Sequence, residues 1–169
     1  MSNIYVHKDD EGQFLLNVAV INDEIFLIAN VYGDPTTDTN AARNIDRLIA
    51  QIENIHHRFL IIHTIMGGDF NFALFDEDRR TTSRKIRSEA KFATLVSTYE
   101  LIDTAIICSD LYPRHTYFRH RMPGVSARYD RIYVTANLVP GITYATLRRT
   151  NDHAPIRISI MEHRKGIKQ

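Results

Sequence analysis

The sequence predicts a single layered α/β domain, of the α+β kind, in which helices pack on β-sheet. The length of 169 residues is typical of one domain, and we expect that domain to span residues 1–169. Runs with strand character alternate along the chain with two stretches in which apolar residues recur at helical spacing. Strands mixed with helices, including hairpins, favour a layered α/β arrangement.

The composition is that of a globular domain. Hydrophobic residues make up 44% of the chain and charged residues 24%, which excludes collagen-like, coiled-coil and disordered classes. No apolar run is long enough to cross a bilayer, and no basic-then-apolar leader is present, so we expect no membrane partner and no signal peptide. The lone Cys108 cannot form an internal disulfide, which is consistent with a reducing compartment.

The first half of the chain predicts three strands and a helix. Ile4–His7 is a short strand, and Phe14–Ile21 and Ile25–Tyr32 form a hairpin across a polar connection. A helix is expected to begin at a capping residue within Thr36–Thr39. Its buried stripe consists of Ile45, Leu48, Ile49, Ile52 and Ile55.

The second half predicts a helix among further strands. A strand at Phe59–Met66 is expected to end at Gly67-Gly68, and residues 76–83 to form a loop. A helix over Arg84–Tyr99 has a stripe of Phe92, Leu95, Val96 and Tyr99, with Ser83 or Ser88 as its cap. The last strands are expected at Tyr129–Thr135, Ile142–Leu147 and Ile156–Ile160.

The motif Gly67-Gly68-Asp69-Phe70-Asn71 is the strongest chemical signal. Its glycines let the backbone turn and let a ligand approach closely. If the backbone stays extended, Asp69 and Asn71 point the same way while Phe70 points into the core. A carboxylate beside an amide is suited to hold a water and a phosphate oxygen. The alternative is a Gly-Asp turn closed by an Asx hydrogen bond.

Three further motifs contain groups that can act on a phosphate. In Asn151-Asp152-His153-Ala154-Pro155, the histidine suits acid–base chemistry or a phosphate clamp, unless the segment is only a polar turn. Within Ser126–Tyr133, Asp130 either orients a histidine or forms salt bridges in its strand. In Asn30-Val31-Tyr32-Gly33, the tyrosine either reaches a phosphate or packs before a turn.

These four motifs, taken in order from Asn30 to Pro155, resemble the endonuclease/exonuclease/phosphatase superfamily. The similarity is greatest to the endonuclease domain of LINE-type (non-LTR) retrotransposons, on Leu101-Ile102-Asp103, Thr116-Tyr117 and Asp130-Arg131-Ile132-Tyr133-Val134. The resemblance implies a sandwich of two mixed β-sheets flanked by helices. It further implies DNA as substrate, a reverse transcriptase domain as partner in the full-length element, and a nuclear location.

The resemblance also implies a role for each matching residue. Asp69 would activate the attacking water, Asn71 would hold the phosphate and the nucleophile, and His153 would stabilise the phosphate. Three carboxylates converging on an anionic substrate call for a divalent cation, and oxygen ligands favour Mg²⁺. The remaining implied roles are orientation of His153 by Asp130, a phosphate contact by Tyr32, metal binding by Asp152 and substrate binding by Asn30, Thr116, Arg128 and Asn151.

The sequence departs from the superfamily pattern in several places. Asp34 stands where a proline is usual, Asn151 replaces a serine, and Ala127 and Tyr129 loosen the motif around Asp130. Superfamily members begin with two strands that carry an Asn and the metal-binding Glu, and neither precedes Ile4–His7. We therefore expect an N-terminally truncated domain with an uncovered sheet edge or apolar face, in which loss of the metal-binding Glu leaves this chain inactive.

Charge is divided along the chain. Residues 1–78 contain 4 Lys/Arg and 13 Asp/Glu, whereas residues 79–169 contain 17 and 7. The basic clusters are either solvated surface or contacts to a DNA backbone, and in the second case binding must weaken with salt. The clusters are Arg79-Arg80, Arg84-Lys85-Arg87, Arg114-His115 and Arg119-His120-Arg121.

Two other functions are compatible with these residues. A phosphomonoesterase of the same fold would turn over small phosphate esters such as inositol phosphates instead of DNA. A non-catalytic remnant or interaction module would keep the fold without the chemistry.

Overall fold

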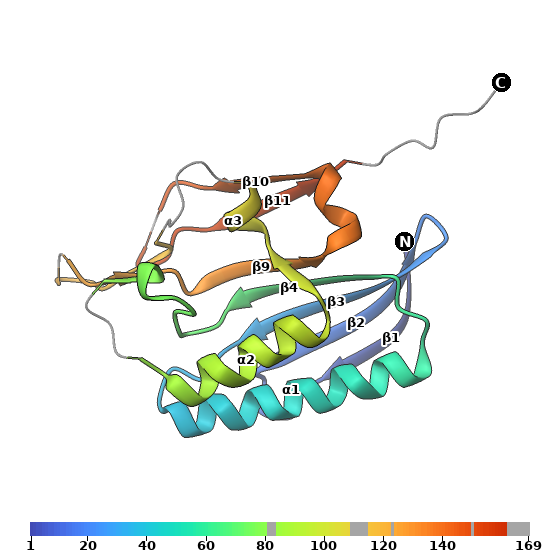
Figure 1. Ribbon diagram of the computed structural model, residues 1–169, viewed down its shortest axis with the longest axis horizontal. Coiled ribbons are helices and arrows are strands. Elements are labelled where there is room, and N and C mark those ends of the chain that lie inside the picture. The colour runs from blue at the N-terminus through green and yellow to red at the C-terminus, as the bar shows by residue number, and fades with distance from the viewer. Residues whose placement is uncertain (81–83, 109–114, 123, 150, 162–169) are drawn as a thin grey trace.

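A mixed six-stranded sheet forms the centre of the protein (Figure 1). The computed structural model describes residues 1–80, 84–108, 115–122, 124–149 and 151–161. The strands are β1 (Ser2–Lys8), β2 (Phe14–Ile21), β3 (Glu24–Tyr32), β4 (His63–Asp69), β5 (Arg79–Arg80), β6 (Leu101–Asp103), β7 (Tyr117–Phe118), β8 (Ser126–Ala127), β9 (Asp130–Thr135), β10 (Ile142–Thr146) and β11 (Ile156–Ile160). The helices are α1 (Asp38–Arg58), α2 (Ile86–Thr98) and α3 (Thr104–Cys108), with short 3-10 helices η1 (Asp76–Asp78) and η2 (Ala136–Gly141).

The strand order in this sheet is β1-β2-β3-β4-β9-β6. β3 and β4 are parallel because α1 connects them, and the other neighbouring pairs are antiparallel. The layered α/β fold is confirmed. The prediction of two mixed sheets needs correction, because the described residues outside this sheet form two small antiparallel sheets, β10-β11 and β5-β8-β7.

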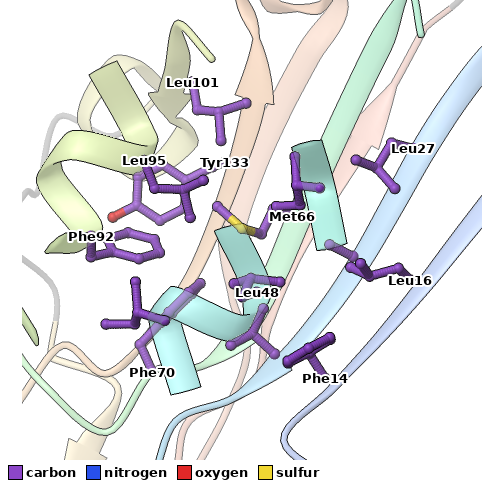
Figure 2. Close-up of a cluster of buried hydrophobic side chains, with 14 of the residues drawn as sticks. Phe14, Leu16, Leu27, Leu48, Met66, Phe70, Phe92, Leu95, Leu101 and Tyr133 are labelled. Atoms are coloured by element: carbon purple, nitrogen blue, oxygen red, sulfur yellow. The ribbon is translucent and has the colours of Figure 1, made fainter. Parts of the chain in front are cut away.

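Apolar side chains fill the space on both faces of the six-stranded sheet. On one face α1 and α2 cover the larger cluster, in which Leu48 of α1 and Phe92 of α2 meet Leu16, Met66 and Tyr133 (Figure 2). The other face carries a smaller cluster around Phe26, Val134 and Leu138, packed against Ile142 of β10 and Ile158 of β11. This burial on both faces fixes the ends of β4 and β9, where the motifs lie.

The first hairpin and the first helix are confirmed. β2 and β3 pair from Phe14↔Val31 to Ile21↔Glu24, and the turn between them places Asn22 and Asp23 at positive φ. The cap of α1 is Thr37, whose side chain accepts a hydrogen bond from the backbone N–H of Asn40. Of the predicted stripe, Ile45, Leu48, Ile52 and Ile55 are buried and Ile49 is partly buried.

β4 begins and ends later than predicted. Phe59 is the C-cap of α1, since its N–H donates to Ile55, so the first residues of the predicted strand belong to the helix connection. At the other end, Gly67 and Gly68 remain paired with β3 on one side and with β9 on the other. The strand therefore runs through both glycines to Asp69.

The N-cap residue of α2 is Lys85, whose side chain makes no capping hydrogen bond, so Ser88 as a cap was wrong, and Ser83 lies outside the described residues. The carboxylate of Asp38 on α1 accepts hydrogen bonds from the backbone N–H groups of Arg87 (3.0 Å) and Ser88 (2.9 Å). It also accepts one from the hydroxyl of Ser88, at 2.7 Å. Asp38, which lies 50 positions before Ser88 in the sequence, thus provides the acceptor for backbone N–H groups in the first turn of this helix.

Several short elements were not predicted. η1 and β5 occupy part of the expected loop at residues 76–83, of which 81–83 lie outside the described residues. β6, α3, β7, β8 and η2 are also additional. These elements are too short for their apolar residues to show a helical or strand period, and β7 and β8 contain only two residues each.

β1 is the edge strand of the six-stranded sheet, and its outer face is open. The side chains of Ile4 and Val6 are about half exposed, at 46% and 49%. Among the helices that the structure describes, none combines the length and the hydropathy needed to span a membrane.

Candidate active site

Three of the four motifs meet at one end of the sheet. Tyr32 at the end of β3 is the register partner of Asp69 at the end of β4, and Asp69 is the partner of Asp130 at the start of β9. The parallel β3–β4 pair brings two carboxyl ends of strands to the same edge, which is where ligands bind in many α/β sheets. The fourth motif reaches this edge through an isolated bridge between His153 and Tyr117 of β7.

His153 lies between two carboxylates. Its Nδ1 is 2.8 Å from Oδ2 of Asp130, and its Nε2 is 3.8 Å from Oδ2 of Asp69. The first distance is a hydrogen bond, and the second is an ion-pair separation that is too long for one. All three side chains are partly accessible, with exposed fractions of 32%, 18% and 20% for His153, Asp69 and Asp130. A substrate can therefore reach each of them.

Thr116 holds the Asp130 strand and the His153 segment together. Its hydroxyl accepts hydrogen bonds from the backbone N–H groups of Tyr129 (3.1 Å) and Asp130 (2.9 Å). Its carbonyl accepts one from the N–H of Ala154, at 2.7 Å. Tyr117 stacks on Tyr129 and also lies against the ring of His153. These contacts fix the backbone on both sides of the Asp130–His153 pair.

Asn71 does not extend the strand as predicted. It adopts a left-handed conformation with φ +54°, and its N–H donates to Oδ1 of Asp69 at 2.9 Å, which is the alternative Asx bond. Its side-chain amide nitrogen donates one hydrogen bond to the carbonyl of Gly33 at 2.8 Å, which leaves its oxygen and its second N–H for a ligand. The side chain of Phe70 is buried in the core, as expected.

The loop after β3 lies directly against this turn. The N–H of Gly33 donates to the carbonyl of Asp69 at 2.7 Å, and a Cβ on Gly33 would stand 1.9 Å from the carbonyl oxygen of Phe70. Only glycine fits such a close approach. The next carbonyl, that of Asp34, accepts a hydrogen bond from Nζ of Lys85 at 2.5 Å. Lys85 thus places a half-buried cation beside the site.

The electrostatic surroundings shift the pKa values of two of these groups. Burial raises the pKa of Asp69; the charge of Asp130 adds to this, while the Asn71 N–H and the charge of His153 oppose it. Desolvation lowers the pKa of His153, but the hydrogen bond and charge of Asp130, with the charges of Asp69 and Asp152, outweigh it and raise the pKa. The imidazolium form, in which both ring nitrogens donate, is therefore favoured.

One ligand atom each of Asp69, Asp130 and His153 lies within 4.8 Å of the others, which is close enough to share a metal ion, although in the imidazolium form of His153 only the two carboxylates can bind it. The two carboxylates fit a hard divalent cation, because Mg²⁺ takes one or two carboxylates and fills its other positions with water and phosphate. Asp152, the predicted metal ligand, is not part of this group among the described residues. Its exposed side chain lines a neighbouring cavity instead.

The structure separates the four predicted substrate-binding residues into two pairs. Thr116 and Arg128 have no exposed surface, so neither can contact a substrate, and that part of the prediction is wrong. Both side chains serve internal contacts, which a sequence motif cannot distinguish from ligand contacts. Asn30 and Asn151 are exposed, as is Tyr32 at 49%, and all three are accessible to a ligand. The roles of the accessible residues stay predictions.

A basic cavity of about 830 Å³ adjoins His153. It lies along β7 and β8 and the turn between them, and its lining includes Asn151 and Asp152, which precede His153 in the chain. The Arg149 guanidinium lies over the ring of Phe118, 4.6 Å from its centroid. Of the predicted basic clusters, Arg114 lies outside the described residues. The arginines that line the cavity are Arg80, Arg119, Arg121 and Arg149, and His120 lines it as well.

Sequence reasoning missed Asp78 and gave Asp103 no role beyond its place in the resembling segment Leu101-Ile102-Asp103. Both are buried, and both pair with Arg128. Lys85 was noted only as one member of a basic cluster. A buried acid has no sequence signature of its own, although two arginines that flank Asp130 in a buried strand required acidic partners.

Comparison with known proteins relates the chain to nucleases and to a transposon. No protein-family model matches it. Over 138 residues it is 33% identical to the Transposon TX1 uncharacterized 149 kDa protein of Xenopus laevis. The match covers 79% of this chain but 10% of that protein, so the chain spans about a tenth of the relative's length.

Solved nuclease structures share its fold. The 3'-5' exonuclease NExo from Neisseria meningitidis superimposes with a TM-score of 0.75 at 17% identity, over 94% of this chain and 71% of that one. An AP endonuclease from Archaeoglobus fulgidus also gives 0.75, at 14% identity and the same coverage. The endonuclease domain of TRAS1, a telomere-specific non-LTR retrotransposon, gives 0.64 at 14% identity, over 94% and 69%.

Proposed function

Because the chain has the fold of the endonuclease/exonuclease/phosphatase superfamily, we propose that it hydrolyses phosphodiester bonds of DNA, as a retrotransposon-type endonuclease domain. The observation that carries this proposal is the placement of His153 between the carboxylates of Asp69 and Asp130 at an accessible end of the sheet. The similarity to a transposon protein favours the retrotransposon assignment, and a product DNA hairpin bound to NExo favours DNA.

In the proposed reaction Asp69 acts as the general base. Burial raises the pKa of Asp69, which makes its carboxylate a better proton acceptor than that of an ordinary aspartate. Water attacks phosphorus and gives its proton to Asp69; the P–O bond to the leaving oxygen breaks, and that oxygen takes a proton from solvent. The bond from its amide nitrogen to the carbonyl of Gly33 fixes the side chain of Asn71, which contributes its oxygen and its second N–H to the water and the phosphate.

His153 is the electrostatic clamp on the phosphate. Asp130 holds Nδ1, which leaves Nε2 of the imidazolium to donate to a non-bridging phosphate oxygen. Asp69 and Asp130 would hold Mg²⁺ through carboxylate oxygens, and the bound ion would neutralise phosphate charge and lower the pKa of a bound water. Tyr32 stands in the same register row and contacts the phosphate through its exposed hydroxyl.

The basic cavity supplies the DNA contacts beyond the cleaved phosphate. The exposed Arg119, Arg121 and Arg149 line it next to Asn151, so their charges suit the phosphates of a bound strand. We assign Asn151 and Asn30 as polar contacts on either side of the site. We further propose that residues 1–169 form one domain and that, in the full-length element, this domain works together with a reverse transcriptase domain.

The test is nicking of supercoiled plasmid by the purified protein in Mg²⁺. The unmodified chain is expected to produce nicked circles, EDTA to abolish them, and Asp69→Ala and His153→Ala each to slow the reaction by roughly 10² or more. Asp46→Ala, which removes an exposed carboxylate paired with Lys91 on the helical layer, is the matched control and should cleave normally.

Two outcomes would replace the proposal. A plasmid that stays supercoiled with every preparation, while the protein is folded, would favour the non-catalytic alternative. Turnover of small phosphate monoesters without nicking would favour a phosphomonoesterase.

A further inference from the structure

Four buried charges lie directly behind the candidate site. The guanidinium of Arg128 makes two hydrogen bonds to the carboxylate of Asp78, from Nε to Oδ1 at 2.8 Å and from Nη2 to Oδ2 at 3.2 Å. Its Nη1 is 2.7 Å from Oδ2 of Asp103, and Nη2 of Arg131 is 3.3 Å from Oδ2 of Asp78. The exposed fraction of these four side chains does not exceed 5%.

The charges balance, but stability alone does not account for them. Burial opposes ionisation of Arg128, and its bonds to Asp78 and the charge of Asp103 nevertheless raise its pKa. Buried ion pairs repay their desolvation poorly, and well-packed apolar side chains at the same positions are often as stable or more so. What a planar, two-bond Arg–carboxylate contact provides beyond apolar packing is a fixed geometry.

These contacts hold the chain on both sides of Asp130. Arg128 precedes Asp130 by two residues and Arg131 follows it directly, so the side chains that bracket Asp130 are held by the same carboxylate of Asp78. Backbone hydrogen bonds connect the same segments. The N–H of Arg128 donates to the carbonyl of Asp78 at 2.7 Å, and the N–H of Phe70 donates to the carbonyl of Tyr129 at 3.0 Å.

We propose that Asp78 and Arg128 are positioning residues that fix Asp130 in the orientation in which it holds Nδ1 of His153. Their contact ties η1, which follows the Asp69–Asn71 turn, to the start of β9. Asp69 and Asp130 are thereby kept at a set separation across the β4–β9 pair. The catalytic consequence rests on the proposed function, whereas the structural claim about His153 does not.

The primary variant is Arg128→Lys. It keeps the charge balance, but a lysine cannot form the two-bond contact to Asp78. The structural readout is the downfield proton NMR resonance of His153 Nδ1–H bonded to Asp130, recorded in EDTA and assigned by its loss in His153→Ala. We expect Arg128→Lys and Asp78→Asn to lose or broaden this resonance, and kcat for DNA cleavage to fall roughly tenfold or more with KM within about twofold.

The matched control is Asp9→Asn. Asp9 has a nearly buried side chain, 4% exposed, paired with Arg47 of α1, and it contacts neither β9 nor η1 in the described residues. This variant should lose stability as Asp78→Asn does and keep the His153 resonance.

The outcomes separate the two proposals. Loss of the resonance in Arg128→Lys or Asp78→Asn with its retention in Asp9→Asn supports the positioning role, even if the unmodified chain cleaves no DNA. An unchanged resonance and kcat in a destabilised but folded Arg128→Lys would overturn it. Failure of both variants to show the native circular dichroism spectrum would also overturn it, because the network would then serve folding and not alignment.

Discussion

At the scale of single residues, Thr116 was predicted to bind substrate, but in the structure it stabilises the backbone around Asp130. Its hydroxyl accepts two backbone N–H groups, those of Tyr129 and Asp130, and it has no exposed surface. A motif records only that a hydroxyl is present at this position. The fold determines that the hydroxyl faces inward, where it takes the place of a strand partner for two residues at the start of β9.

We expect Thr116→Val to be destabilising and Thr116→Ser to be close to neutral. Valine keeps the shape but leaves two amide donors without an acceptor, at a cost of about 1–3 kcal/mol for each buried group. Serine keeps the acceptor. Urea unfolding followed by circular dichroism measures the difference, with Thr94→Val on the exposed face of α2 as control. Equal stability of the valine and serine variants would contradict the assigned bonds.

At the scale of elements, α2 depends on α1 for its first turn. Desolvation raises the pKa of Asp38, but hydrogen bonds from the Ser88 hydroxyl and from the N–H groups of Arg87 and Ser88 lower it overall below 3.8. The ionised carboxylate therefore stabilises the fold above about pH 4. That contribution is lost as the pH falls through the depressed pKa of the folded state.

Asp38→Ala should lower the free energy of unfolding by about 0.5–2 kcal/mol at pH 7, the usual effect of removing a helix cap. The difference from the unmodified chain should shrink below pH 4, because both proteins then lack the charge. Urea titrations at pH 7 and pH 3 measure it. Asp46→Ala removes an exposed ion pair between the same two helices and should change stability by less than about 1 kcal/mol. A pH-independent difference would contradict the prediction.

Local elements were predictable from the sequence where local contacts decide them. The β2–β3 hairpin and α1 follow from their own apolar periods, with Thr37 as a cap three residues before the N–H that it satisfies. The start of β4 and the cap of α2 were wrong, because the first depends on the helix end at Phe59 and the second on Asp38 of another helix. The convergence of Asp69, Asp130 and His153 was inferable only through family resemblance.

At the scale of the whole molecule, the acidic and the basic parts of the sequence form different parts of the fold. The acidic first part of the chain supplies the hairpin and α1, and the basic second part supplies the residues around the cavity beside His153. The acidic site thus lies next to a cationic surface. If the chain acts on DNA as proposed, this arrangement would attract the polyanion to the site although the net charge of the chain is only +1.

DNA binding should therefore be salt-dependent, and the cavity arginines should set the slope. In fluorescence anisotropy titrations of duplex DNA in EDTA, Arg119→Gln and Arg149→Gln should each weaken binding and reduce the slope of log K against log salt by about 0.9, one phosphate contact each. Arg43→Gln on α1 carries the same charge change at a residue paired with Glu11, away from the cavity lining, and should leave the slope unchanged. Equal effects at Arg43 and Arg149 would mean that net charge alone, and not the cavity, attracts the DNA.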